Sequence, residues 1–253
     1  MLNKIETRAS KEISDKSFKK ENDILSKKII EYQKKMNAGG KHSLLLIFQG
    51  MDASGKDGAV RRVLSGINPN GCIVKSFKKP TDEEYAHDFL WRVHQNTPGK
   101  GMIQVFNRSH YEDILVPSVL GFIPKDVIES RYEMINNFEK MIESNGTTIL
   151  KFYLHVSKEE QLERLQERVD NPEKYFKHKD GDWETRELWD DYMKVYHSIF
   201  EKCNVIPWHI IPSDQNWHKT NLISKVIVDA FEKMDMKWPE LDSELFKNEV
   251  LTN

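Results

Sequence analysis

The segment LLLIFQGMDASGKDG (residues 44–58) decides the fold of this chain. Five consecutive apolar residues, 44–48, are typical of a strand that is buried on both faces of a sheet. A glycine-rich loop follows at once, and we expect residues 56–65 to open a helix. This order predicts an anion site, because the glycines let successive backbone N–H groups point at one centre and the helix N-terminus adds partial positive charge.

The loop fits the first seven positions of the Walker A pattern, with Gly50, Gly55 and Lys56 at the required spacing. Lys56 supplies a mobile positive charge that can bridge phosphate oxygens. The alternative is a turn that contains glycines by chance, and the complete spacing in front of a helix argues against it. The predicted phosphate contacts of the loop are Gly50, Ser54, Gly55, Lys56 and Gly58.

Two acids set this loop apart from the usual pattern. Asp57 stands where Ser or Thr normally follows the lysine, and Asp52 lies inside the loop. A carboxylate ~4 Å from a phosphate charge repels it by about 4 kcal/mol at an effective dielectric constant near 20. A divalent cation between them removes that repulsion, so the acids predict bound Mg²⁺, with Mn²⁺ as the second candidate. For Asp57 alone, the alternative is an acid that stabilises the first turn of the helix.

A second motif, FNRSHYED (residues 106–113), overlaps the end of a strand candidate at 102–106. Ligands of open parallel sheets bind at the carboxyl ends of the strands. The motif therefore faces the phosphate loop if the two strands are neighbours. Arg108 is then placed to bind phosphate bidentately, and Glu112 or Asp113 can complete a metal shell. The alternative is a capped turn with solvated charges.

A basic segment at about 164–185 predicts a lid. Arg164 and Arg168 lie four residues apart on one face of a predicted helix, and Lys174 and Lys177 follow in a turn-rich stretch. Arginines that close over a transferring phosphoryl group stabilise its charge and exclude water. The alternative is a solvated helix face on which the arginines pair with neighbouring glutamates, and the sequence favours neither.

The rest of the chain alternates strands with helices. This pattern predicts an α/β fold with a parallel five-stranded sheet covered on both faces. We expect an N-terminal arm and helix at 1–40, a phosphotransferase domain at 41–235 and a C-terminal tail at 236–253. The remaining strand candidates are 72–77, 149–156 and 205–211, and the helix candidates are 21–37, 82–95, 124–144, 158–169, 184–203 and 218–234.

Composition excludes several classes of partner. The formal net charge is −2, which gives no general attraction to nucleic acid or to an anionic membrane. No stretch approaches the roughly 18 apolar residues of a membrane span, and the charged N-terminus is not typical of a secretory signal. Cys72 and Cys203 form neither a disulfide framework nor a metal motif. We therefore expect a cytoplasmic protein.

Taken together, these motifs resemble the polyphosphate kinase 2 family. The resemblance rests on GMDASGKDG (50–58), FNRSHYED (106–113) and Arg164-x-x-x-Arg168 followed by Pro172-Glu173-Lys174. It extends from about residue 25 to residue 233. One position departs from the family's usual lid pattern, because Phe176 stands where that pattern has Trp. Further matching segments are NPNGC (68–72), AHDFLWR (86–92), WDDYM (189–193) and PWHIIP (207–212).

The resemblance implies a three-layer, thymidylate-kinase-like P-loop kinase fold with a helical lid. It implies transfer of a terminal phosphate between inorganic polyphosphate and adenine or guanine nucleotides, and the HYED form is similar to the branch that accepts both AMP and ADP. It also implies a homodimer or homotetramer. The residue roles it implies are Mg²⁺ binding by Asp52, Asp57 and Glu112 and phosphate contacts from Lys56, Asn107, Arg108 and Arg168. We also expect a phosphate contact from Ser109, and we expect Asp52, Lys56, Arg108 and Arg168 to be catalytic.

Two rival functions fit the same motifs. An ATP-dependent nucleoside or nucleotide kinase would use the same loop but hold an adenine on the donor side. A non-catalytic P-loop binding protein would need the glycines and the lysine alone. The acids of the loop argue against the second rival, because a simple anion binder gains nothing from carboxylates at its site.

Overall fold

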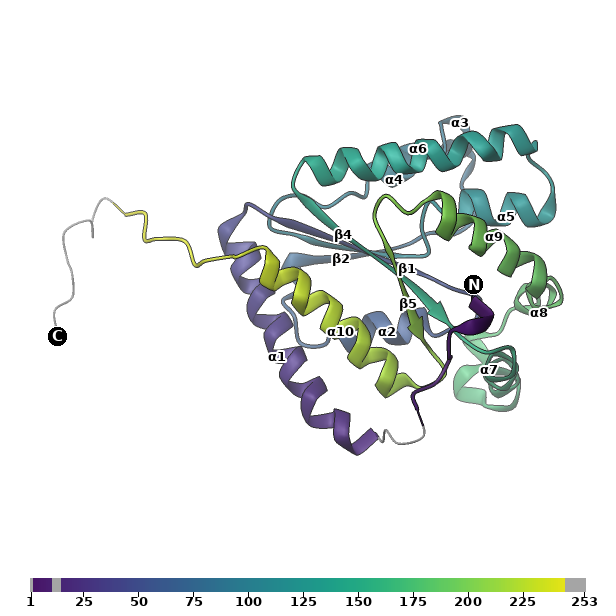
Figure 1. Cartoon of the computed structure of the whole chain (residues 1–253), viewed down its shortest axis with the longest axis horizontal. Helices are drawn as coiled ribbons and strands as arrows, with labels where there is room; N and C mark the ends of the chain where they lie inside the picture. Colours follow the sequence, from purple (N-terminus) through teal and green to yellow (C-terminus); the bar gives the residue numbers. More distant parts are fainter. Residues whose placement is uncertain (1, 11–14, 244–253) are drawn as a thin grey trace.

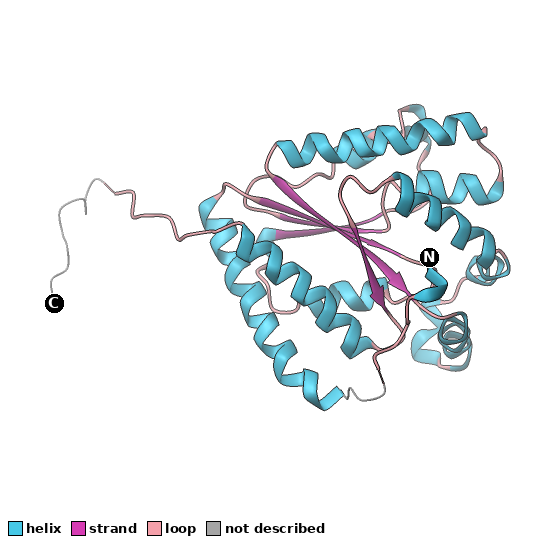
Figure 2. Ribbon diagram, in the orientation of Figure 1, coloured by secondary structure: helices cyan, strands magenta, loops and turns pink. Residues whose placement is uncertain are grey.

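The computed structural model describes residues 2–10 and 15–243 of the chain. Its centre is a five-stranded sheet in which every neighbouring pair of strands is parallel, in the order β2-β3-β1-β4-β5 (Figure 2). The predicted α/β class and sheet are thereby confirmed. The strands are β1 (Ser43–Gln49), β2 (Cys72–Ser76), β3 (Ile103–Asn107), β4 (Thr147–His155) and β5 (Trp208–Pro212).

Strand β1 is apolar from residue 44 to residue 48 because helices cover both faces of the sheet. Leu44, Leu46 and Phe48 pack in one apolar cluster with α1 (Asp15–Gly39), α2 (Lys56–Val63) and α10 (Asn216–Lys233). Leu45 and Ile47 point to the other face, where they join a cluster that includes α6 (Lys125–Ser144). Figure 1 shows the three layers, with α1, α2 and α10 on one side of the sheet and α5, α6 and α9 on the other.

Two predicted helices are divided in the structure. The candidate at 82–95 forms α3 (Asp82–Ala86) and α4 (Trp91–His94), because the chain is extended at His87 and the Asp88 side chain accepts the Leu90 N–H at 2.9 Å. The candidate at 184–203 begins earlier and forms α8 (Asp180–Glu187) and α9 (Trp189–Lys202).

Helix α5 (Glu112–Leu120) was not predicted. It contains Pro117, and a proline inside a short segment argues against a helix from sequence alone. The remaining elements are α7 (Lys158–Asp170) and the short 3₁₀ segments Leu2–Lys4, Pro69–Gly71 and Pro172–Lys177.

The sequences TDEE (81–84) and SKEE (157–160) each predict a capping box at a helix start, and the structure shows a different outcome for each. Thr81 and Glu84 make both reciprocal bonds of a box at the start of α3. At the start of α7, Ser157 accepts the Glu160 N–H at 3.1 Å, but the Glu160 carboxylate binds Arg8 and Arg164 instead of the cap backbone. The prediction was therefore right for the first helix and half right for the second.

The described part of the N-terminal arm lies against its own chain rather than standing free. Leu2 is buried, and the Thr7 hydroxyl donates to Asp214 at 2.8 Å in the loop after β5. Helix α1 packs along α10, as Figure 1 shows. Residues 236–243 form neither helix nor strand, and the rest of the predicted tail lies outside the described residues.

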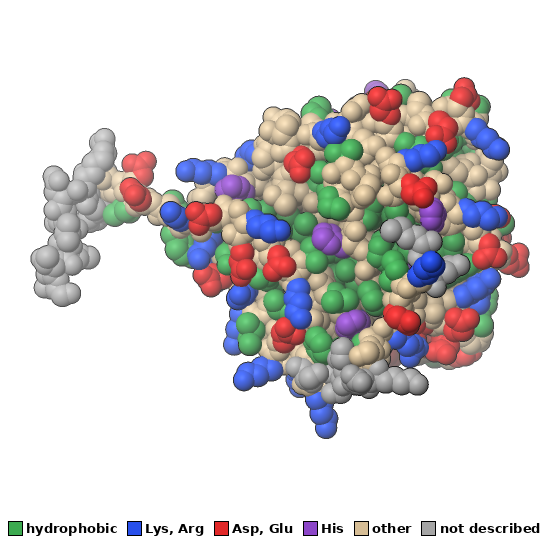
Figure 3. All heavy atoms as spheres, in the orientation of Figure 1, with side chains coloured by type: hydrophobic (Ala, Val, Ile, Leu, Met, Phe, Trp, Pro, Cys, Tyr) green, Lys and Arg blue, Asp and Glu red, His purple; other side chains and the backbone are tan. Residues whose placement is uncertain are grey.

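The surface carries both signs of charge. Figure 3 shows lysines and arginines interspersed with aspartates and glutamates over one face of the molecule. No helix in the described part of the chain combines the length and the apolar character that a membrane span requires.

A fully buried ion pair lies behind the FNRSHYED motif. Lys151 on β4 donates to Glu139 on α6 at 2.7 Å and to the Tyr111 hydroxyl at 2.8 Å. Tyr111 donates to Glu139 at 2.7 Å, and His110 Nε2 lies 3.2 Å from the same carboxylate. Burial raises the pKa of Glu139, but the bonds from His110 and Lys151 outweigh it and hold that pKa below its usual value. The pair therefore fixes two residues of the motif from behind.

We predict that Glu139→Ala lowers the free energy of unfolding by about 3–5 kcal/mol, because it leaves the Lys151 charge buried without a partner. Urea denaturation measures this. The control is Glu129→Ala on the same helix, which breaks an exposed pair with Lys202 and should cost less than about 1 kcal/mol. A loss from Glu139→Ala no larger than that of the control would contradict the prediction.

Candidate active site

The phosphate loop joins the end of β1 to the start of α2, and its backbone is held in unusual conformations. Gly50 and Gly55 have φ angles of 149° and 92°, and Ala53 has a φ of 61°. Residues other than glycine rarely adopt such φ angles. A methyl group on Gly50 would also lie 2.8 Å from Ser54 Oγ and 2.9 Å from the Leu154 carbonyl oxygen. The glycines are therefore required by both conformation and space.

Lys56 is buried within the loop. Its Nζ donates to the Gly50 carbonyl at 2.7 Å and to the Met51 carbonyl at 3.1 Å. Burial lowers the pKa of Lys56, and the charge of Arg108 lowers it further. An anion in the loop would favour the charged form of this amine, which fits its predicted phosphate contact.

Arg108 links the loop to the FNRSHYED motif. It directly follows β3, has a φ of 60°, and its N–H donates to the Phe48 carbonyl of β1 at 3.0 Å. Its guanidinium forms an ion pair with Asp52 and lies 3.5 Å from Glu112. The charge of Glu112, together with that of Asp52, raises the pKa of Arg108 above its ordinary value, and burial raises the pKa of Glu112. The expected meeting of the two motifs is confirmed by the β1–β3 pairing.

The three predicted metal ligands each have a partner in the protein. Asp52 and Glu112 share Arg108, and Asp57 accepts a hydrogen bond from Asn107. Within residues 2–10 and 15–243, no three or more His, Cys, Asp or Glu side chains gather in an arrangement that could hold a metal ion. Asp113 instead binds Arg92 at 3.0 Å. The metal assignment stays a prediction.

Arg164 lies beneath the loop and does not face the substrate side. Its Nη1 donates to the carbonyls of Ala53 at 3.0 Å and Ser54 at 3.1 Å. Its Nη2 donates to the carbonyls of residues 213 and 214, and its Nε to Glu160. These bonds use the five N–H groups of the guanidinium, so the structure places Arg164 as a support of the loop rather than as a phosphate ligand.

Ser109 is also placed away from the expected phosphate. It is fully buried, and its hydroxyl accepts the Gln49 side-chain amide at 3.0 Å. Its contact links the ends of β1 and β3, which is a structural role.

The cations of the lid pair within the lid. Arg168 binds Asp182 at 2.5 Å and the Lys177 carbonyl at 3.1 Å, and Lys174 pairs with Glu167. Burial raises the pKa of Asp182, and the negative charge of Asp52 adds to that shift, so the lid pair lies close to the loop. Lys177 lies beside the exposed ring of Phe176.

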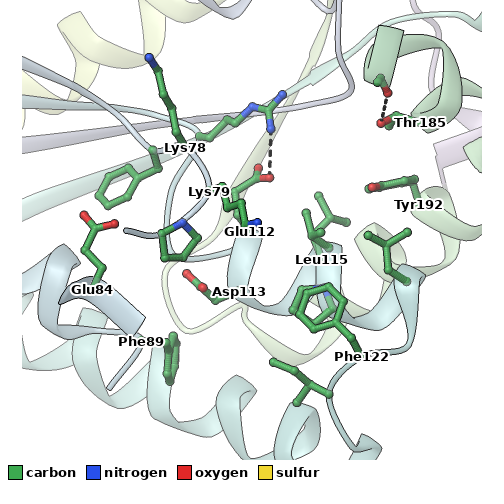
Figure 4. Close-up of a pocket in the computed structure, with 18 of the residues that line it drawn as sticks. Lys78, Lys79, Glu84, Phe89, Glu112, Asp113, Leu115, Phe122, Thr185 and Tyr192 are labelled. Carbon is green, nitrogen blue, oxygen red and sulfur yellow. Dashed lines mark hydrogen bonds and ion pairs between the residues drawn. The ribbon is translucent and has the colours of Figure 1, made fainter. Parts of the chain in front are cut away.

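A cavity of about 700 Å³ opens beside the loop. Gly50, Asp52, Arg108 and Glu112 form one end of it. Figure 4 shows Glu112 and Asp113 pointing into the space, with Lys78 and Lys79 on one side and Leu115 and Phe122 on another. The basic lining residues are Lys78, Lys79, Arg92, Arg108 and Arg131, and the apolar wall includes Leu115, Val116, Leu120, Phe122 and Ile123.

The comparison with protein families identifies the family of the chain. A sequence model of the family described as Polyphosphate kinase 2 matches residues 12–239. The chain belongs to the polyphosphate kinase 2 family. The family predicted from the loop, the FNRSHYED motif and the lid pattern is thereby confirmed.

Several members of the polyphosphate kinase 2 family are similar over most of their length. The chain is 46% identical over 219 residues to the AMP/ADP-polyphosphate phosphotransferase of Meiothermus ruber, covering 86% of this chain and 82% of that protein. It is 42% identical over 227 residues to the ADP-polyphosphate phosphotransferase of Rhodopseudomonas palustris, covering 84% and 78%. The crystal structure of a polyphosphate kinase 2 from Arthrobacter aurescens TC1 matches with a TM-score of 0.92 at 37% identity, covering 96% of this chain and 89% of that chain.

Several residues that line or support the site were not predicted from the sequence. Arg92 had a signal, because it lies in the AHDFLWR segment, whereas the basic doublet Lys78–Lys79 is a candidate contact of a long anion on the sequence alone and was not missed. Arg131 and Phe122 had none, because only the packing of α5 and α6 brings them to the cavity. Lys219 on α10 had none either, although its Nζ lies 3.2 Å from the Ser54 carbonyl oxygen.

Proposed function

We propose that this protein transfers the terminal phosphate of inorganic polyphosphate to ADP and AMP. The supporting observation is the single cavity that joins the phosphate loop to a basic and an apolar wall. Its volume of about 700 Å³ lies within the range of ordinary ligand pockets. One space can therefore hold an acceptor nucleotide with its phosphate directed at the loop. The names of the similar proteins from Meiothermus ruber and Rhodopseudomonas palustris support this choice of substrates.

The acceptor fits the cavity in one orientation. Its base lies against the apolar wall, where Leu120 and Phe122 are more than half exposed without it. Its phosphates lie toward Arg108, near the basic side chains of residues 78, 79, 92 and 131. The donor chain ends in the loop, where backbone N–H groups and Lys56 bind its phosphates.

The chemistry is an in-line displacement at phosphorus. An oxygen of the acceptor's terminal phosphate forms a bond to the last phosphorus of the chain, and the bridging P–O bond behind that phosphorus breaks. The leaving chain keeps the electron pair and is one phosphate shorter. Because the attacking oxygen is already anionic, no strong general base is needed, and catalysis comes from positioning and charge stabilisation.

We assign Mg²⁺, with Mn²⁺ as the alternative, to Asp52, Asp57 and Glu112. When bound, the cation would neutralise charge on the transferring group. One or two cations would share these three carboxylates, because Mg²⁺ prefers oxygen ligands and each ion takes only one or two carboxylates besides phosphates and waters. Arg108 and Asn107, which pair with these acids in the structure, are also predicted phosphate ligands. Phosphate binding would therefore release the acids.

We also propose that Arg168 takes part in catalysis. It lies in the segment that can close over the loop, and its partner Asp182 is near Asp52. We also propose a cytoplasmic homodimer or homotetramer without nucleic-acid or membrane partners. The free cysteines Cys72 and Cys203 fit a reducing compartment.

The first prediction from this function concerns the donor. With Mg²⁺ and long-chain polyphosphate, the purified protein should convert ADP to ATP and AMP to ADP, as followed by nucleotide chromatography. A parallel reaction with ATP as donor and AMP as acceptor, but without polyphosphate, should be slower. Transfer from ATP alone would assign the protein to the ATP-dependent kinases, and transfer in neither reaction would favour a non-catalytic binding protein.

The second prediction concerns Asp52. Asp52→Asn should lower kcat by at least about 100-fold, because it removes both the negative charge that pairs with Arg108 and a proposed metal ligand. The far-UV circular dichroism spectrum should stay that of the wild type. The control is Asp191→Asn, an exposed acid on α9, which should leave kcat unchanged. Turnover near the wild-type rate in Asp52→Asn would remove this residue from the site.

The third prediction concerns the apolar wall. Phe122→Ala should raise KM for ADP about tenfold and leave KM for polyphosphate unchanged, because stacking of a base on an aromatic ring contributes ~1–3 kcal/mol. Trp238→Ala removes an exposed aromatic side chain outside the cavity and serves as the control. An equal rise in both KM values, or none, would place the base elsewhere.

A further inference from the structure

Lys219 is a buried lysine that the proposed reaction does not use. It lies on α10, on the face of the sheet opposite to α5 and α6, and it is fully buried. Burial, together with the charges of Arg164 and Arg62, lowers its pKa to about 7. A buried charge of this kind destabilises the fold unless it is paired or bonded. Its contacts therefore need an explanation.

The contact that Lys219 makes is with the phosphate loop. Its Nζ donates to the Ser54 carbonyl at 3.2 Å. A methyl group added to Gly55 would lie only 2.5 Å from the same nitrogen, so the amine is packed directly against the loop backbone. Arg164, from α7, donates to the same Ser54 carbonyl at 3.1 Å. Two cations from helices far apart in the sequence thus meet at one carbonyl oxygen.

Because the peptide bond is planar, this contact also determines the direction of an N–H group in the phosphate site. In a planar trans peptide, the C=O of one residue and the N–H of the next point in opposite directions. Bonds from Lys219 and Arg164 hold the Ser54 carbonyl toward the helices. The Gly55 N–H is therefore directed to the opposite side, where the glycine loop forms its anion cradle.

We propose that Lys219, with Arg164, is a positioning residue that holds the loop in its phosphate-binding conformation and, in its protonated form, adds positive charge behind it. Lys219 does not touch the phosphate, since the Ser54 peptide lies between them. The inference rests on the proposed function only in taking polyphosphate as the ligand of the loop. The other charged groups that face Lys219 are Arg62 on α2, Glu160 and Arg164 on α7, and Asp214 in the loop after β5.

The test is Lys219→Met, which keeps the length of the side chain and removes its charge and donors. We expect Kd for inorganic triphosphate, measured by calorimetry without nucleotide, to rise at least about tenfold. KM for polyphosphate should rise by a similar factor, with kcat within about threefold of the wild type. Lys219→Gln keeps an N–H donor without the charge and should give a smaller rise.

The matched control is Lys225→Met on the same helix, an exposed lysine paired with Glu21, which should change neither constant. Triphosphate affinity within twofold of the wild type in folded Lys219→Met would overturn the proposal. Failure of both Lys219 variants to fold would assign the residue to the core and would overturn it equally. A third outcome separates the two proposals. If the wild type binds triphosphate but transfers no phosphate to nucleotides, and Lys219→Met binds triphosphate more weakly, the proposed function fails and the positioning role stands.

Discussion

Each backbone carbonyl of the phosphate loop from residue 50 to residue 54 is bound by a side-chain donor, and the arrangement of the site depends on these bonds. Lys56 binds the carbonyls of residues 50 and 51, Gln161 binds that of Asp52, and Arg164 binds those of residues 53 and 54. Each carbonyl from 50 to 54 therefore accepts a side-chain bond. This fixes the directions of the intervening N–H groups before any ligand arrives, which is the preorganisation that charge stabilisation requires. Helix α7 supplies two of these donor side chains, Gln161 and Arg164, so the conformation of the loop depends on the position of α7 as well as on the glycines.

The same arrangement explains how a chain with a net charge of −2 can hold a polyanion. The cations packed around the loop, Lys56, Arg164 and Lys219, are largely shielded from solvent, and their charges act over short distances at a low effective dielectric constant. Acids balance them locally, as Asp52 and Glu112 do for Arg108. In the proposed reaction, an incoming phosphate would compete with these carboxylates for Arg108, and the proposed divalent cation would bind the acids that the phosphate displaces. The distant surface, where Figure 3 shows mixed charges, contributes little to this exchange.

Sequence patterns predicted the parts of the molecule that depend on neighbouring residues. The buried strand at 44–48, the loop, the capping box at Thr81 and the parallel sheet follow from local periodicity and turn chemistry, and the structure confirms them. The role of Arg164 could not be read in the same way, because its spacing to Arg168 is equally typical of a lid and of a support. Its carbonyl partners in the loop, Ala53 and Ser54, are more than 100 residues away in the chain. Lys219 shows the same limit more strongly, because it lies 165 residues from Ser54 and in no recognisable motif.

The two halves of the site are supported from different sides of the sheet. The phosphate loop is held by α7 and α10, whereas the FNRSHYED motif is held by the buried Lys151–Glu139 pair from β4 and α6. The halves meet through the β1–β3 register and the bond from the Arg108 N–H to the Phe48 carbonyl. Helix α5 begins at Glu112 and carries the apolar wall on its later turns, while Ile114 and Leu115 anchor it in the core. Exposed residues of that wall can therefore change without moving Glu112, so the acceptor can be selected separately from the phosphate chemistry.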